Sequence, residues 1–127
     1  GMPDGWENRY FGSPTAGDPA GHGDDDTAPN LDEFNGDTDP TDGTSYLRIV
    51  GMETFDFLVF RVAEVTFPSS AYRQYRVEHA NAPGLVTNGW TAGTSGYEEG
   101  TGGDMDSVDI LFTDVTGALF RVRGKLP

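Results

Sequence analysis

The pattern of hydrophobic and polar positions changes about a third of the way along this chain of 127 residues. In the first part apolar side chains are sparse. Residues 2–11 predict a short helix, and residues 30–34 predict one further helical turn with Leu31 and Phe34 pointing inward. The intervening residues 13–29 are rich in Gly, Pro and Asp, which predicts irregular backbone.

Beyond this part the apolar residues recur with a period of two. Six segments of this kind predict strands, at residues 46–50, 55–60, 62–67, 72–79, 108–112 and 119–123. Short strands separated by turn residues favour a mainly β protein, an antiparallel β-sandwich of the immunoglobulin or fibronectin type III kind. The glycine-rich residues 93–103 predict a long exposed loop, and residues 113–117 a hairpin-length connection.

The predicted core of this sandwich collects the apolar side chains that alternate along the strands. Tryptophan at position 90 joins them, because a large ring between strands is expected to bury in the core. The predicted core residues are Leu47, Ile49, Phe57, Val59, Val65, Phe67, Tyr75, Val77, Trp90, Ile110, Phe112, Phe120 and Val122.

Charge divides the chain at the same place. The net charge is −13, and residues 1–43 contribute −10 of it, with eleven acidic residues and one arginine. We therefore expect an acidic segment, 1–43, and a sandwich domain, 44–127. So acidic a chain is a poor match for nucleic acid or anionic lipid, both of which attract basic surfaces. The longest apolar run is far too short to span a membrane, and the chain has no cysteine.

Closely spaced oxygen donors between residues 22 and 33 predict a calcium site. Calcium binds six to eight oxygens, and a twelve-residue loop supplies them from positions 1, 3, 5, 7, 9 and 12. With glutamate at position 12, the remaining donors are side chains at positions 3, 5 and 9 and a backbone carbonyl at position 7. The predicted ligands are Asp24, Asp26, Ala28, Asn30 and Glu33. Loops that begin at other aspartates place Pro29, Asn35 or Arg48 at position 12, so Glu33 fixes the register.

These acidic residues belong to a longer pattern. The sequence has Gly-Met-Pro-Asp-Gly-Trp-Glu at 1–7, Asn-Leu-Asp-Glu-Phe at 30–34 and Thr-Asp-Pro-Thr-Asp at 38–42. It resembles the thrombospondin type 3-like calcium repeats found near the C-terminus of large secreted bacterial proteins. The resemblance implies that Asp4 and Glu7 are the remainder of a preceding repeat. Because His22 and Thr27 replace the family's first aspartate and its turn glycine, it also offers Asp18, Asp37, Asp39 and Asp42 as substitute ligands.

The second part of the chain resembles the small fibronectin type III-like sandwich that often follows such repeats. Tyr-Arg-Val-Glu at 75–78, Trp90 and Phe-Arg-Val-Arg at 120–123 are the residues that match. The resemblance implies a module at the C-terminus of a larger secreted or cell-surface protein. On this interpretation Gly1 is a cleavage remnant or the cut edge of that protein.

Other chemistries receive less support from the sequence. His22 and His79 are too far apart for a zinc site without cysteine, and His79 is expected at the surface. Asp104, Asp106 and Asp109 are better interpreted as turn residues than as a second cation site. Glu98 and Glu99 lie in the glycine-rich loop, where nothing is predicted to bury them and raise a pKa for glycoside hydrolysis.

We therefore expect a protein that is not an enzyme, a structural or adhesion module that calcium stabilises. Its partners would be the preceding domains of its parent protein. Two alternatives stay open. One is a module that binds carbohydrate or a surface polymer through Trp90 and Tyr97, and the other is a subunit that self-assembles into a surface filament or layer through exposed strand edges.

Overall fold

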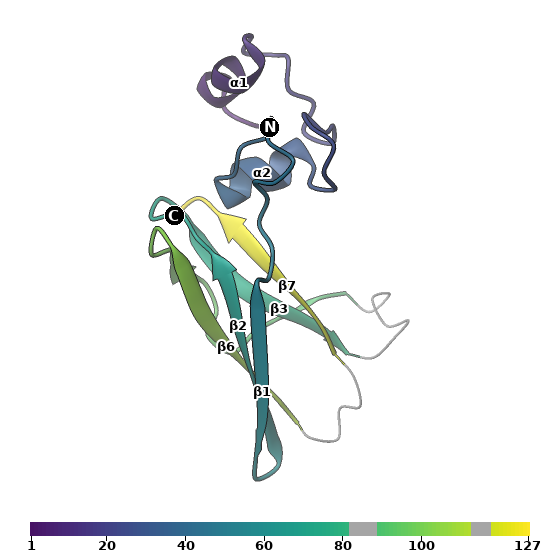
Figure 1. Cartoon of the computed structure of the whole chain (residues 1–127), viewed down its shortest axis with the longest axis vertical. Coiled ribbons are helices and arrows are strands. Elements are labelled where there is room, and N and C mark those ends of the chain that lie inside the picture. Colours follow the sequence, from purple (N-terminus) through teal and green to yellow (C-terminus); the bar gives the residue numbers. More distant parts are fainter. Residues whose placement is uncertain (82–88, 113–117) are drawn as a thin grey trace.

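The computed structural model describes residues 1–81, 89–112 and 118–127 (Figure 1). The described chain is mainly β, with antiparallel sheets and two short helices, as the sequence predicted. The helices are α1, Asp4–Phe11, and α2, Asn30–Gly36, which lie together at one end of the molecule (Figure 1). Pro3 and Pro29 directly precede them, where a missing N–H costs no helical hydrogen bond.

Within the described residues, seven strands form two sheets. They are β1 Gly51–Phe57, β2 Phe60–Pro68, β3 Gln74–Asn81, β4 Thr91–Ala92, β5 Glu98–Glu99, β6 Asp104–Phe112 and β7 Ala118–Lys125. One sheet has the order β1-β2-β6. In the other, β3 pairs with β4 and β5 along one edge and with β7 along the other, and every pairing is antiparallel.

The two sheets face each other across a small apolar core, consistent with a β-sandwich. Val65 and Phe67 of β2 and Tyr75 and Val77 of β3 are all at most 1% exposed, and Met105 of β6 joins them. The rings of Phe67 and Tyr75 pack with centroids 5.7 Å apart. Leu47, Ile49, Phe120 and Val122 close the margin of this core. The prediction of burial is thus confirmed for the four central side chains.

The apolar run at 55–60 contains a turn that the sequence did not reveal. Phe57 pairs directly with Phe60, so Leu58 and Val59 form a two-residue hairpin loop between β1 and β2. Tight hairpin loops ordinarily carry Asn, Asp or Gly, and this loop has none of them. The single predicted strand is therefore wrong, and the residues divide between β1, the turn and β2.

The predicted strand at 46–50 is also wrong, since β1 begins only at Gly51. Leu47 and Ile49 pack against the core as their alternation suggested, and the Val50 amide donates to the Thr66 carbonyl oxygen at 2.8 Å. Alternation of side chains reports which positions are buried, and here it continues beyond the paired backbone.

Four predicted core residues do not lie in the core. Phe57, Val59 and Ile110 are 63, 57 and 42% exposed. Phe57 and Ile110 lie on the outward face of their sheet, and Val59 lies in the hairpin turn, where no second layer covers it. Trp90 is only partly buried, because it lies under the guanidinium of Arg121 outside the core. The side chain of Phe112 and the connection at 113–117 lie outside the described residues.

Several strands differ in extent from the prediction. β6 begins at Asp104 rather than at Val108, and β3 runs from Gln74 to Asn81. The loop predicted at 93–103 contains the two-residue strand β5. Its glycines permit close approach to β3 and to the segment before it, because a methyl group at Gly93 would lie 2.7 Å from the Val77 carbonyl oxygen and one at Gly100 2.0 Å from that of Ser70. In α2, Phe34 is buried as predicted, while Leu31 is 38% exposed.

The C-terminal end of α2 is the contact between the acidic segment and the sandwich. The buried guanidinium of Arg73 donates to the Phe34 carbonyl oxygen at 3.2 and 3.1 Å and pairs with Asp37. The Tyr75 hydroxyl donates to the Gly36 carbonyl oxygen at 2.8 Å. Carbonyl groups at a helix C-terminus have no partner within the helix and favour positive charge, so both side chains cap α2.

Close packing of α2 on β7 completes this contact. A methyl group at Gly124 would lie 2.4 Å from the Asn35 carbonyl oxygen, so only glycine allows the two backbones to approach this closely. Phe34 of α2 also packs edge-on against Trp6 of α1, with ring centroids 5.6 Å apart. Phe34 thus links α1, α2 and Arg73.

The junction predicts unequal effects for two tyrosines that lie three residues apart. Tyr75→Phe removes the donor to Gly36 and the acceptor of the Ser70 amide, so we expect a loss of about 1–2 kcal/mol in the free energy of unfolding. Tyr72→Phe is the matched control, because Tyr72 is 76% exposed. Urea denaturation should show a lower midpoint for the Tyr75 variant only. Equal midpoints would contradict the role assigned to this hydroxyl.

Candidate functional site

The loop before α2 is shaped by two aspartates that bind its own backbone. The Asp24 carboxylate accepts from the Asp26 amide at 3.1 Å, and the Asp26 carboxylate accepts from the Ala28 amide at 2.7 Å. Asp and Asn readily form such turns, which hold the side chain against the chain that follows. Each aspartate uses its Oδ1 atom in this way and leaves Oδ2 available.

Two further candidate ligands, both oxygens, come from side chains of α2. Asn30 starts the helix, its backbone amide donates to Gly21 at 2.8 Å, and its side-chain amide donates to the Asp18 carbonyl oxygen at 2.9 Å. These bonds leave the Asn30 Oδ1 atom without a donor. Glu33 is in the first turn of the same helix and is 1% exposed.

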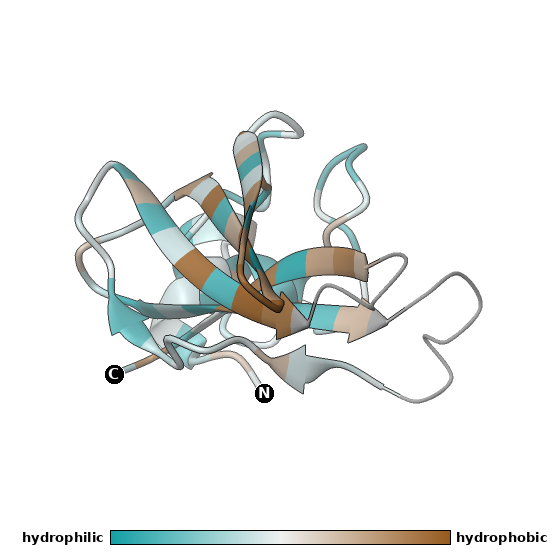
Figure 2. Cartoon of the chain, turned by 90° about the horizontal axis from the view of Figure 1, so that it is seen from below, coloured by the Kyte–Doolittle hydropathy of each residue, from teal (hydrophilic) through white to brown (hydrophobic). Residues whose placement is uncertain are grey.

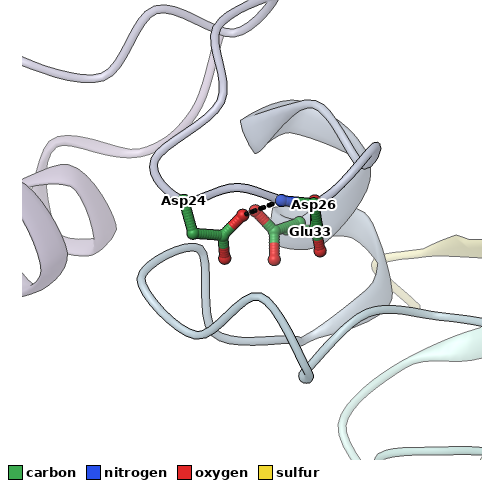
Figure 3. Close-up of side chains that lie close together, drawn as sticks. All are labelled: Asp24, Asp26 and Glu33. Carbon is green, nitrogen blue, oxygen red and sulfur yellow. Dashed lines mark hydrogen bonds between the residues drawn. The ribbon is translucent and has the colours of Figure 1, made fainter.

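These side chains converge. Asp24, Asp26 and Glu33 each present an oxygen within 4.8 Å of the others, from the loop and from α2 (Figure 3). Among the described residues, buried side-chain oxygens without a hydrogen-bond partner belong to four side chains, Asp24, Asp26, Asn30 and Glu33. They are the predicted ligands at positions 3, 5, 9 and 12 of the loop. Buried oxygens without donors are rare and require an explanation.

The raised pKa of Glu33 also indicates that negative charge is concentrated in this cluster. Burial and, after it, the neighbouring charges of Asp24 and Asp26 together raise the pKa of Glu33 to about 7, and Asp39 contributes in the same direction. The weak hydrogen bond from Thr38 opposes this shift only in part. The site therefore concentrates negative charge that the protein's own side chains do not neutralise.

The donor set fits calcium. Three carboxylates and one amide oxygen are hard ligands, which calcium prefers, and the cluster contains no nitrogen or sulfur donor that would favour zinc. Asp24, Asp26, Asn30 and Glu33 would hold the ion, which would supply the positive charge that the buried oxygens lack.

The other predicted ligands have different surroundings. Asp37 accepts from Ser70 and pairs with Arg73, so it faces the sandwich. The Asp42 carboxylate is exposed and caps the Thr44 amide, while Asp39 caps the Thr41 amide close to Glu33. On α1, Asp4 is exposed, and Glu7 is buried beside Gly17. In the described part of the chain, the three-carboxylate group that could hold a metal contains none of these five.

Trp90 and Tyr97 lie on the outward face of the second sheet, and cations cover one face of each ring. Arg121 lies 4.3 Å from the Trp90 centroid, and Arg76 and Lys125 lie 4.7 and 4.2 Å from that of Tyr97. Glu78, which is 2% exposed, accepts from both arginines. The two rings thus belong to one alternating array of cations and aromatics.

His79 and the aspartates of residues 104–109 are placed differently from expectation. The prediction that His79 is a surface residue is wrong, because its side chain is 12% exposed and bonds Asp109 at 2.5 Å across the two sheets. Asp104, Asp106 and Asp109 lie on β6 and not in a turn. Asp106 accepts from Thr66 on the outward face, whereas Asp109 points between the sheets, so the three do not converge.

Sequence reasoning missed the residues that bind the site to the sandwich. Arg73 and Tyr75 lie about 40 positions after Glu33, and no spacing rule connects them with a loop so distant. Burial of an arginine at the start of a strand is not encoded by alternation. Thr38, which donates to Glu33, was available as a hydroxyl near a predicted ligand.

Comparisons with family models, with curated proteins and with solved structures give no match to this chain. Among the helices of the described residues, neither α1 nor α2 has the length and apolar character needed to cross a membrane.

The array around Glu78 predicts a dependence of stability on acid. Burial alone would raise the pKa of Glu78, but hydrogen bonds and charge from Arg121 and Arg76 outweigh it and hold the pKa below 4.5. The ionised carboxylate thus stabilises the fold above pH 4.5, and this contribution is lost as the pH falls through the lowered pKa.

We expect Glu78→Gln to lower the free energy of unfolding by about 2 kcal/mol at pH 7, with a smaller difference from the unmodified chain at pH 3. Glu53→Gln is the control, since Glu53 is an exposed carboxylate on an edge strand. Urea denaturation at both pH values would measure the two differences. A Glu78 effect that does not shrink in acid would contradict the assigned role.

Proposed function

We propose that this chain is a non-catalytic structural or adhesion module that calcium stabilises, within a larger secreted or cell-surface protein. The observation that carries the proposal is the set of four buried oxygens without donors, on Asp24, Asp26, Asn30 and Glu33. The sequence had selected the same four side chains by their spacing, independently of their positions in space. A solvated acidic loop would instead leave its oxygens in contact with water.

Calcium would act by fixing the position of α2. Calcium would join the loop of Asp24 and Asp26 to Glu33 on α2, and α2 is bonded at its other end by Arg73 and Tyr75. An ion that fixes α2 therefore fixes the direction in which the acidic segment leaves the sandwich. Without it, the repulsion among three carboxylates favours opening of the loop.

For the sandwich itself we propose a fibronectin type III-like arrangement. The support is the division of strands between the sheets, with β1, β2 and β6 in one sheet and β3 and β7 paired in the other. The core at the interface of β2 and β3 has the alternating pattern of such domains.

Calcium binding is tested by substitutions that keep the shape of each side chain. Titration calorimetry should detect calcium uptake by the unmodified chain and none by Glu33→Gln or the double variant Asp24→Asn and Asp26→Asn. Asp25→Asn is the matched control, because Asp25 is exposed and lies between the two ligands without joining the cluster. Absence of calcium uptake by the unmodified chain at millimolar concentration would overturn the proposal.

Glu33→Gln also has an expected effect without calcium. The folded pKa of about 7 lies above the ordinary glutamate pKa of 4.5, so the folded metal-free state loses stability as the pH rises from about 4.5 through 7. The substitution removes this penalty, which amounts to at most about 3 kcal/mol above pH 7. At pH 8 in chelator, thermal unfolding of the variant should therefore occur at a higher temperature than that of the unmodified chain.

The structural role is tested by proteolysis. Residues 13–43 contain no Lys or Arg, so a glutamyl endopeptidase that cuts after Glu33 and Asp is used in place of trypsin. In chelator, we expect faster cleavage within residues 13–43, with residues 44–127 intact, as read by mass spectrometry. Asp25→Asn should keep the protection by calcium, and the double variant Asp24→Asn and Asp26→Asn, which retains the cleavage site at Glu33, should lose it. Cleavage that is equally fast with calcium and with chelator would count against the structural role.

A further inference from the structure

Large apolar side chains are exposed together at the turn between β1 and β2. Phe55, Phe57, Leu58, Val59 and Ile110, here named the hairpin patch, are 58, 63, 81, 57 and 42% exposed. The turn forms the end of the molecule opposite α1 and α2 (Figure 1). Figure 2 views the molecule from this end and shows apolar bands across the strands there.

Strand register places the three strand residues of the patch, Phe55, Phe57 and Ile110, on one face. Phe55 is opposite Val62, which is opposite Ile110, and residues directly opposite in antiparallel strands share a face. Phe57 is two residues from Phe55 and shares that face too. Nearer the helices the same face becomes polar, with Glu53 opposite Glu64. The patch is thus a bounded surface and not a scattering of exposed residues.

The turn is unusual in a way that favours a role for the patch. Leu58 has φ of 56°, in the left-handed region, and is 81% exposed. Glycine is the ordinary residue at such a position, because a side chain there is sterically costly. Leucine in this position neither relieves the turn nor buries its own side chain. Strained backbone of this kind is found where a function requires the side chain.

The patch is large enough for association. With residue areas of about 150–200 Å² each, the exposed fractions correspond to roughly 450–600 Å² of apolar surface. Two such surfaces would bury about 900–1,200 Å² in total, the size of a weak, concentration-dependent protein interface.

We propose that the hairpin patch binds the same patch of a second copy of this chain, giving a symmetric dimer. Charge favours this occupant. The acidic segment, with its charge of −10, lies at the far end of the long axis, so contact between two hairpins keeps the acidic segments of the copies apart (Figure 1). Asp56 and Arg61, the charged residues between Phe55 and Val62, pair with each other at 2.8 Å and leave the patch neutral.

A lipid surface is a poorer match. Hairpins that insert into membranes ordinarily gain attraction from basic residues beside the apolar tip. The cation adjacent to this turn is Arg61, and Asp56 already neutralises it. The three-strand face next to the turn is instead suited to packing against another sheet.

Sedimentation of the full chain over a range of concentrations tests the proposal. We expect a mass that rises to twice the 13.7 kDa of one chain and then stops, since a symmetric contact closes on itself. Phe57→Thr should weaken association about tenfold or more without lowering the melting temperature. Leu126→Thr is the matched control, because Leu126 is 49% exposed beside the C-terminus at the other end of the molecule.

Leu58→Gly separates association from folding. The substitution relieves the left-handed conformation, so the melting temperature of the monomer should rise while association weakens. Association should also persist in chelator, because the patch and the acidic cluster share no residue. A chain that stays monomeric at all concentrations would overturn the proposal. So would an unaltered dimer of Phe57→Thr, or a monomer that binds phosphatidylcholine vesicles through the patch.

Discussion

Arg73, directly before β3, and Tyr75 of β3 donate hydrogen bonds to carbonyl oxygens at the C-terminal end of α2, and the arrangement of both halves depends on these bonds. Both donors are buried, so each bond is protected from water and the loss of either removes a buried hydrogen bond from the end of α2. Through α2 the bonds also orient Glu33, which lies directly before Phe34. The position of the acidic cluster is therefore determined by the sandwich, although no residue of the cluster belongs to it.

The two sides of α2 make opposite electrostatic demands. Toward the sandwich, its C-terminal carbonyls and Asp37 are satisfied by the guanidinium of Arg73, a cation that the protein itself supplies. Toward the loop, Glu33 faces Asp24 and Asp26 and has no cation among its own contacts. Residues 1–43 have a net charge of −10 and contain a single arginine, so the basic residues of this segment cannot neutralise its carboxylates. On the function proposed above, a cation from solution would supply the charge that orders this side.

How far the sequence predicts this structure differs between its parts. Spacing alone selected Asp24, Asp26, Asn30 and Glu33, because a loop of twelve residues brings its own donors together locally. Alternation correctly placed Val65, Phe67, Tyr75 and Val77 in the core. It failed at Phe57 and Ile110, which lie on the outward face of their sheet. Period two separates the two faces of a strand, but it does not show which face is buried when both carry apolar side chains. It also failed at Leu58, where the turn has no turn residue, and at Arg73, whose partner is about 40 positions away.

These failures are not spread evenly. In the middle of the sandwich, where Val65 and Phe67 pack on Tyr75 and Val77, local preference and tertiary environment agree. The residues whose local preference disagrees with their tertiary environment lie at the two ends of the long axis. At one end three carboxylates and one amide each keep a buried oxygen without a hydrogen-bond donor, and at the other a leucine adopts a glycine conformation with its side chain in water. Each feature costs free energy in the isolated chain, by desolvated charge at one end and by strain and exposed apolar area at the other. Natural sequences retain such costs at functional sites. A cation and an apolar surface would offset them, and they would do so independently, because the well-packed core lies between the two ends and neither ligand touches the residues of the other.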